Sequence, residues 1–391
     1  MALLMLLLGA NLPLHAHAKG DSYRLELITD ELVKPVSLTT LADGRLLVTQ
    51  LDGQVMVVED GAVRTEPFLN LVSLVTALAG EQGLFSAALE PLSGSSSFGR
   101  PPRLIAAYTE RDSGDLVVAA FPSNEELTRA DESAKHELLR VPMPEPFHHG
   151  GQVAFGPDGM LYVSVGNGES ANHFLHEQPW SAQDLSLLRG KLLRLALSPP
   201  ASEAAYLVPD GNPFVNTAGA RPEIYALGFR NPWKFTFDDH SSALILSDVG
   251  NDRWEEVNLV EAGGNYGWPA REGRECQYLP DAPGLVDPDC ASRSFVEPLA
   301  VYGHLAIDPA GGQAVTGGMV VHDPALPELA GHYLFSDFVV GRLWSLELGS
   351  GTLTLLLDTD LAITQVAEGP GHEVLVLAIS GELLRLRHEP D

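Results

Sequence analysis

The region that decides the fold spans residues 147–168 and reads FHHGGQVAFGPDGMLYVSVGNG. A Gly-Pro-Asp-Gly turn leads into the run LYVSV, whose alternation of apolar and polar residues is typical of a half-buried β-strand. Two histidines and two glycines come directly before this unit. The glycines at 150 and 151 let the backbone turn sharply and approach a ligand closely. The stretch therefore predicts a strand unit with a candidate site at its start.

The same kind of unit recurs along the whole chain. Its core is a turn, often with Asp-Gly, then an alternating strand, a second turn and a second strand. Paired short strands at a period of roughly 40 to 80 residues predict the blades of a β-propeller, in which neighbouring sheets bury each other's faces. We expect one closed all-β domain over residues 22–388, with the first and last strands sharing a blade. The copies begin at Leu41, Arg103, Phe155, Phe237, Gly331 and Ala367.

Composition narrows the class of protein. The chain has 391 residues, 45% of them hydrophobic, with 38 glycines and 28 prolines, so a large core with many turns is expected. Its formal net charge is −28, and no run of Lys or Arg is present. A nucleic-acid binder needs a basic stripe to neutralise phosphate, so nucleic acid and anionic membrane surfaces are excluded as partners.

The N-terminus predicts export. Residues 1–20 read MALLMLLLGANLPLHAHAKG, a short apolar run followed by Ala-His-Ala at 16–18. Such a run is too short to span a bilayer and ends in a small-residue cleavage pattern, so we expect a signal peptide at residues 1–18. The basic residues that usually open such a peptide are missing. We expect a periplasmic or secreted protein without a membrane span.

The two cysteines, Cys276 and Cys290, predict one disulfide. In an exported chain a lone pair most simply closes a loop. A metal site is not expected there, because neither cysteine belongs to a Cys-x-x-Cys pair or has a histidine nearby.

Three segments carry the candidate chemistry. His148 and His149 precede the strand unit above, where they either line the axial mouth of the propeller or bond a backbone carbonyl. Arg230 interrupts an apolar strand pattern in EIYALGFRNPWKFTFD, residues 223–238. The segment 247–269, SDVGNDRWEEVNLVEAGGNYGWP, is rich in carboxylates and glycines. Such oxygen-rich loops suit calcium and are also common as solvated faces.

These segments resemble the glucose/sorbosone dehydrogenase family, the soluble sugar dehydrogenases that use pyrroloquinoline quinone (PQQ). The resemblance runs in the family's order from about residue 30 to 388 and implies a six-bladed propeller, in agreement with the repeat count. ALGFRNPW together with GGNYGWP is its most specific part. The other matching pieces are GEQGLFSAALEP (80–91), HHGGQVAFGPDGMLYVSVGNG (148–168), GKLLRL (190–195), VTGGMVV (315–321) and GHYLFSDFVVGRLWSL (331–346).

The resemblance also implies roles. His148 matches the family's general base, which takes the proton from the sugar's anomeric hydroxyl while hydride moves from C1 to the quinone. Arg230 matches the arginine that polarises the quinone carbonyl. Asn231 matches a residue that contacts the cofactor, and Gln82 lies in a segment that lines the same mouth.

A calcium site is implied by the same resemblance. The loop from Gly250 to Glu256 matches a calcium-binding loop near the cofactor. Its expected ligands are Gly250, Asn251, Glu255 and Glu256.

Several positions depart from the family pattern. Asn167 stands where the family usually has an aspartate that orients the histidine, so a weaker base is expected. PQQ carries three carboxylates, whose burial requires fixed cations. The family's lysine and Arg-x-Arg positions are here Val339, Ala362 and Thr364, and Arg342 is the cation that remains close by. Other cations that could substitute are Lys191, Lys234, Arg271 and Arg274.

These departures resemble the hedgehog-interacting-protein-like branch of the family, and they leave two functions open. The first is a PQQ-dependent aldose dehydrogenase, acting on a small-molecule sugar with an unknown electron acceptor, as a monomer or homodimer. The second is a non-catalytic propeller that binds a glycan or protein at the axial mouth. A calcium-dependent hydrolase is a third alternative, but the residues show no set of nucleophile, base and orienting group for it.

Overall fold

The computed structural model describes residues 22–77, 80–91, 100–169, 180–199, 202, 204–279, 282–286 and 290–389. The predicted signal peptide, residues 1–18, lies outside the described residues. Among those residues there is no helix with the length and hydrophobicity that a bilayer crossing requires. The described helices are short 3-10 turns at Glu132–Ala134, Cys290–Ser292, Pro327–Leu329 and Pro370–His372.

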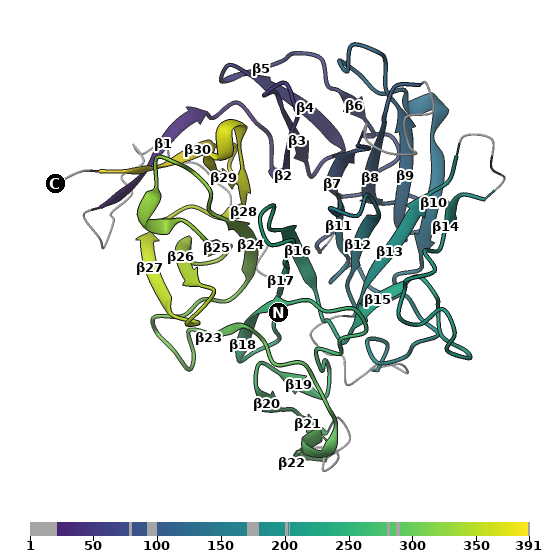
Figure 1. Ribbon diagram of the computed structural model, residues 1–391, viewed down its shortest axis with the longest axis vertical. Helices are drawn as coiled ribbons and strands as arrows, with labels where there is room; N and C mark the ends of the chain where they lie inside the picture. The colour runs from purple at the N-terminus through teal and green to yellow at the C-terminus, as the bar shows by residue number, and fades with distance from the viewer. Residues whose placement is uncertain are drawn as a thin grey trace.

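The strands form six antiparallel sheets arranged around a central axis (Figure 1). Each of these six sheets is one blade, and in the first five blades the strands follow one another along the chain, beginning with the innermost. The first blade contains β2 (Pro35–Thr40), β3 (Leu46–Gln50), β4 (Gln54–Glu59), β5 (Ala62–Val63) and β6 (Leu69–Asn70). The second contains β7 (Leu84–Leu89), β8 (Arg103–Thr109), β9 (Leu116–Pro122) and β10 (His136–Val141). The third contains β11 (Gly150–Phe155), β12 (Leu161–Val165), β13 (Lys191–Leu197), β14 (Tyr206–Leu207) and β15 (Ile224–Leu227).

The last three blades close the ring. The fourth blade contains β16 (Pro232–Phe237), β17 (Leu244–Asp248), β18 (Trp254–Leu259) and β23 (Ala300–Gly303). The fifth contains β24 (Val315–Val320), β25 (His332–Asp337), β26 (Arg342–Glu347) and β27 (Leu353–Asp358). The sixth contains β28 (Ile363–Glu368), β29 (Val374–Ala378), β30 (Leu383–His388) and β1 (Tyr23–Thr29). Strand β1 pairs with β30, so the first and last strands share the sixth blade, as the repeats predict. The all-β, six-bladed propeller predicted from sequence is confirmed.

Packing between neighbouring blades holds the ring together. Each inner strand contacts the inner strands of the two adjacent blades, and the contact between β2 and β28 completes the circle. The buried apolar residues fall into six clusters, each shared by two neighbouring blades. Because no blade has a core of its own, a single blade would leave both of its faces exposed to water. Stability is therefore a property of the closed ring.

The inner strands also define one end of the axis as the mouth. The segments that precede β7, β11 and β16 are joined by hydrogen bonds. Glu81, before β7, accepts hydrogen bonds from the backbone N–H of His148, before β11, and from the side chain of Asn231, before β16. Since each second strand runs antiparallel to the first, the turns that follow β12 and β17 reach the same end. We call this cluster of strand starts and turns the axial mouth.

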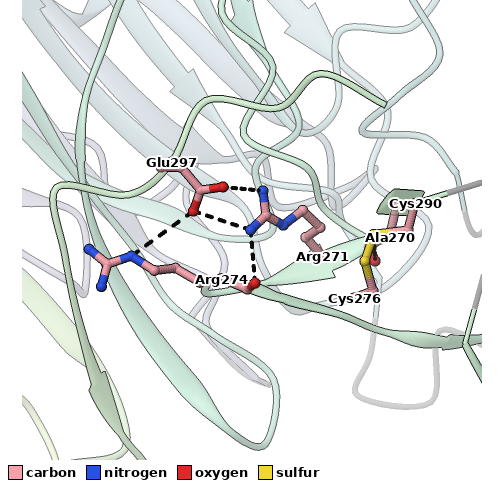
Figure 2. Close-up of a disulfide and its surroundings, with 6 residues drawn as sticks. All are labelled: Ala270, Arg271, Arg274, Cys276, Cys290 and Glu297. Carbon is pink, nitrogen blue, oxygen red and sulfur yellow. Dashed lines mark hydrogen bonds and ion pairs between the residues drawn. A yellow bond between two sulfur atoms is a disulfide. The ribbon is translucent and has the colours of Figure 1, made fainter. Parts of the chain in front are cut away.

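A long insertion leaves the fourth blade between β18 and β23. It carries the small strands β19 (Arg271–Glu272), β20 (Glu275–Cys276), β21 (Tyr278–Leu279) and β22 (Ala282–Val286), which project from the ring in Figure 1. The predicted disulfide between Cys276 and Cys290 is present and ties this insertion together (Figure 2). Beside it, Glu297 accepts hydrogen bonds from both terminal nitrogens of Arg271.

Candidate active site at the axial mouth

His148 lies at the mouth, directly before the inner strand β11. Its side chain is buried, and its Nδ1 lies 3.1 Å from Oδ1 of Asn167, which follows β12. The φ angle of His148 is 52°, a left-handed conformation that is uncommon outside glycine. The next residues, Gly150 and Gly151, also have positive φ, and a side chain on Gly151 would collide with the ring of Phe85. The glycine pair thus lets the chain turn sharply at the mouth, as expected.

The second histidine has a structural role. His149 is buried, its Nε2 lies 2.9 Å from the carbonyl oxygen of Glu145, and its Nδ1 lies 3.1 Å from the Thr109 hydroxyl. Burial lowers its pKa below the ordinary value of a histidine. Two roles were left open for the histidine pair. His149 bonds a backbone carbonyl, and His148 lies against residues of the mouth.

Arg230 and Asn231 are fixed by a buried carboxylate. The two oxygens of Asp248, at the end of β17, accept the backbone N–H groups of Arg230 and Asn231 at 2.9 and 2.7 Å. The Arg230 guanidinium donates to the Val249 carbonyl at 3.1 Å and to Asn251 Oδ1 at 3.3 Å. It also lies over the ring of Trp268, 5.5 Å from the centroid.

A carboxylate absent from the sequence prediction joins these groups. Oε2 of Glu81 accepts the His148 backbone N–H at 2.9 Å and the Asn231 side-chain amide at 3.0 Å. Burial raises the pKa of Glu81, although these two donors and the nearby charge of Arg230 oppose the rise. The mouth therefore brings together His148, Asn167, Arg230 and Asn231, and it adds Glu81.

The expected calcium ligands are engaged by other protein groups. Glu255 accepts from His304 Nε2 at 2.7 Å and from the backbone of Val315 at 2.9 Å. Glu256 accepts from the backbone of Gly273 at 2.6 Å. Among the described residues, no group of three or more His, Cys, Asp or Glu side chains is placed to hold a metal. The two carboxylates expected to bind calcium are therefore already hydrogen-bonded within the protein.

The loop itself is organised around a carboxylate of the insertion. Oε1 of Glu272 accepts the backbone N–H groups of residues 251–254 at 2.6, 2.9, 3.1 and 3.3 Å. Burial alone would raise the pKa of Glu272, but these four donors reverse the effect and lower it. Converging N–H groups attract an anion and repel a cation. The backbone N–H groups of this loop are therefore directed at Glu272, and the calcium-binding role expected from the resemblance stays a prediction.

The remaining predicted residues lie away from this cluster. The Gln82 side chain lies close to Gly114, in the turn between β8 and β9 of its own blade. Arg342 donates to the carbonyls of Pro309 and Gly311 and to Asp358 in the fifth blade.

The alternative cations are also used elsewhere. Lys191 donates to the carbonyls of Ser181 and Arg189, and Lys234 to that of Phe85. Arg271 and Arg274 both lie against Glu297 beside the disulfide (Figure 2). None of these contacts places a cation beside His148.

The mouth therefore fits one part of PQQ and not another. The mouth carries a histidine, an arginine and an amide in one hydrogen-bonded network, which are the residue types that a quinone carbonyl and an alcohol substrate require. At the three family positions for carboxylate binding, Val339 is exposed and apolar, Ala362 has no charge, and Thr364 donates its hydroxyl to the Pro35 carbonyl. These residues do not fit a tri-anion.

Comparison with known proteins agrees with this architecture. The model of the family "Glucose / Sorbosone dehydrogenase" matches residues 32–385. The chain belongs to this family. The match covers all six blades, except for strand β1 and the last residues of β30, which pair with each other to close the ring.

Known relatives of the chain carry names of two kinds. HIPL1 protein of Arabidopsis thaliana is 34% identical over 59% of this chain and 35% of its own length. Aldose sugar dehydrogenase YliI of Escherichia coli is 28% identical over 64% and 63%. Human hedgehog-interacting protein is 28% identical over 59% and 34%. The chain thus spans about a third of the length of HIPL1 protein, so the activity and partners of such relatives do not transfer directly.

Solved structures support the fold. The apo form of the soluble aldose sugar dehydrogenase from Escherichia coli has a TM-score of 0.72 at 24% identity, over 94% of this chain and all of that one. The PQQ-bound aldose sugar dehydrogenase from Streptomyces coelicolor has a TM-score of 0.65 at 24% identity, over 96% of this chain and all of that one. At this level of identity the likeness establishes the propeller and leaves the chemistry to the residues.

Glu81 and Asp248 were missed by the sequence prediction. Asp248 was noticed only as part of an acidic loop, and Glu81 only as part of the segment that contains Gln82. Each is a carboxylate that accepts hydrogen bonds from another segment of the chain, 150 residues away for Glu81 with Asn231 and 18 residues away for Asp248 with Arg230. No local pattern marks such a pair, because the fold alone brings the partners together.

Proposed function

We propose that this protein is a sugar dehydrogenase that oxidises the C1 hydroxyl of an aldose at the axial mouth. The observation that carries the proposal is the placement of His148 and Arg230 in one hydrogen-bonded network with Asn167, Asn231 and Glu81. A base and a fixed cation side by side in a buried mouth are what oxidation of an alcohol requires.

The residues divide the work as follows. His148, held at Nδ1 by Asn167, presents Nε2 as the base that accepts the proton of the C1 hydroxyl. Arg230, with its backbone fixed by Asp248, stabilises negative charge that develops on the acceptor. The sugar loses a hydride from C1 and the hydroxyl proton, and it leaves as the lactone. Asn231 holds its amide toward Glu81 and the start of β11.

PQQ is the hydride acceptor that the family suggests, and when bound it supplies an electrophilic quinone carbonyl. Arg230 and Asn231 are the residues that would hold its reacting edge. Since the carboxylate-binding cations are replaced, we expect PQQ to bind more weakly than in a site with all three cations. Any calcium ion here would depend on the carbonyl oxygens of Gly250 and Asn251, because the Glu255 and Glu256 carboxylates are engaged.

Steady-state turnover tests this proposal. The purified protein is titrated with PQQ, with and without calcium, and dye reduction is followed with a panel of aldoses. We expect turnover that falls by about 100-fold or more in His148→Gln, because general-base catalysis contributes about that much. The control is His136→Gln, which changes an exposed histidine on β10. The absence of both PQQ binding and turnover in the unmodified protein would refute the proposal.

One observation favours a second function. The mouth is unfavourable for an anion and compatible with a neutral glycan. It contains the carboxyl group of Glu81, and the family's cationic positions hold the neutral residues Val339, Ala362 and Thr364. The name of the human relative, hedgehog-interacting protein, also describes a protein that binds a partner. In this case the mouth binds a glycan without oxidising it. Calorimetry with neutral oligosaccharides in the absence of PQQ distinguishes the two functions, because the second predicts binding with no dye reduction.

Location and assembly follow from the same proposal. The N-terminal segment and the disulfide support a periplasmic or secreted protein, because disulfides persist in oxidising compartments. Residues 22–388 act as one catalytic domain, as a monomer or homodimer, and an external electron acceptor regenerates the enzyme.

A further inference from the structure

The environment of Asn167 contains a carboxylate that replaces the charge lost from the family pattern. Asn167 Nδ2 lies 3.4 Å from Oε2 of Glu169, and the backbone N–H of Glu169 donates to Asn167 Oδ1 at 3.1 Å. Both side chains are only 1% exposed. The other oxygen of Glu169 accepts the Ser181 hydroxyl at 2.8 Å. Glu169 therefore contacts both ends of the Asn167 amide.

This contact fixes the orientation of the amide. A backbone N–H can only donate, and a carboxylate can only accept, so the atom of Asn167 beside the N–H is the oxygen and the atom beside the carboxylate is the nitrogen. The oxygen is also the atom that faces His148 Nδ1, at 3.1 Å. An oxygen acceptor at Nδ1 requires a proton on Nδ1. The neutral imidazole then carries its lone pair on Nε2.

We propose that Glu169 is a positioning residue that sets the tautomer and the basicity of His148 through Asn167. The inference deepens the proposed function, because it rests on His148 acting as the base. The buried carboxylate polarises the amide, which in turn stabilises an imidazolium at His148. A direct carboxylate contact in the family pattern is thus replaced here by a relay of one amide and one carboxylate.

Other charged groups surround this relay and set the background of the measurement. Glu81 accepts a hydrogen bond from the backbone N–H of His148, and the carbonyl oxygen of Arg230 accepts one from the backbone N–H of Asn167. Arg189 interacts electrostatically with Glu169. Each of these groups is unchanged in the variants below, so a difference between variants reports the Glu169 carboxylate.

The test follows the ring nitrogens of His148 by long-range ¹⁵N–¹H NMR of the full chain without cofactor. The protein as it stands should show the proton on Nδ1. In Glu169→Gln we expect a mixture of tautomers and a lower imidazolium pKa at His148. The matched control is Glu223→Gln, a buried glutamate of the same blade that accepts from Tyr206 and Arg221. It should leave the His148 signals unchanged.

A rescue separates positioning from structural damage. Adding Asn167→Asp to Glu169→Gln returns a carboxylate to direct contact with Nδ1, and we expect it to restore the single tautomer and raise the pKa again. Should Glu169→Gln fail to fold, Ser181→Ala keeps the Glu169 carboxylate but removes the hydroxyl that donates to it. In that variant we expect a smaller shift of the His148 pKa in the same direction. Identical His148 signals in the protein as it stands, Glu169→Gln and Glu223→Gln would overturn the proposal. A protein with these shifts but no sugar oxidation would refute the proposed function alone.

Discussion

At the scale of single residues, the charge of the mouth decides which ligand it accepts. Glu81 sits between the backbone of His148 and the side chain of Asn231, and Arg230 is the cation nearest to it in the described network. Burial raises its pKa, so its protonated form persists to higher pH than that of an exposed glutamate. When ionised, Glu81 repels an anionic ligand.

Substituting Glu81 tests this electrostatic effect. In Glu81→Gln we expect PQQ to bind about tenfold more tightly, which corresponds to about 1.4 kcal/mol, because the amide keeps the shape and removes the negative charge. In the protein as it stands, PQQ affinity should rise as the pH falls through the raised pKa of Glu81. Calorimetric titration at several pH values measures both effects. Equal affinities for the two proteins at every pH would contradict this role.

Sequence reasoning found some of these residues and missed others. His148 stands out because it precedes a strand together with two glycines, and Arg230 because it interrupts an apolar strand pattern; the resemblance assigns their roles. Glu81 and Glu169 do not stand out, because an acidic residue in a loop resembles ordinary solvated surface. Glu81 is buried against partners 67 and 150 residues away, and Glu169 against Asn167 and Ser181, and no local pattern shows either environment.

At the scale of elements, the end of β17 and the start of β18 bury two carboxyls on one sheet. Asp248 and Glu256 face each other in the strand pairing. Burial raises the pKa of Asp248 to about 7, against the hydrogen bonds from Arg230 and Asn231. Burial and the charge of Asp248 raise the pKa of Glu256 to about 8. The fourth blade thus holds more protons when folded than when unfolded.

This proton balance predicts how stability depends on pH. A carboxyl whose pKa is higher in the folded state loses stabilisation as the pH rises from its unfolded pKa to its folded pKa. We expect the free energy of unfolding to fall by about 1–2 kcal/mol between about pH 5 and about pH 7. This pH range lies below the one in which the buried side chains of Lys191 and Lys234, with pKa values of about 7, affect stability. Urea denaturation at the two pH values measures it. In Glu256→Gln the fall should shrink, and an unchanged fall would contradict the assignment.

The insertion shows where sequence prediction of elements was partial. The disulfide follows from the presence of two cysteines in a chain with an export pattern, and it is confirmed. The conformation of the loop at residues 251–254 could not be predicted from its oxygen-rich sequence, because Glu272 of the insertion accepts its backbone N–H groups. Loop composition reports which ligands are available, and loop conformation decides whether oxygen or N–H groups converge.

At the scale of the whole molecule, ring closure determines stability. The repeats predict the six blades because alternation and turn residues are local properties of each strand pair. The pairing of β1 with β30 follows only from the need to close the ring. This junction also shares an apolar cluster between the sixth and first blades, with Leu375 and Leu383 among its buried residues.

Removing the closing strand tests this dependence on the ring. We expect a protein that lacks residues 1–29 to lose the cooperative unfolding transition or to unfold at least about 10 °C lower, because the edge of β30 loses its partner and the chain no longer ties the sixth blade to the first. The matched control lacks residues 1–21 only and retains β1. Calorimetry of both proteins measures the difference. Equal transition temperatures would show that the β1–β30 pairing is dispensable.

The most direct measurement of the central claim is a single turnover at the axial mouth. The protein loaded with PQQ is mixed with excess aldose in the absence of any electron acceptor, and the absorbance of the bound quinone is followed. The account predicts rapid reduction of the quinone, slowed by about 100-fold or more in His148→Gln at unchanged PQQ occupancy. Bound quinone that stays oxidised with every aldose, or that is reduced equally fast in the two proteins, would contradict it.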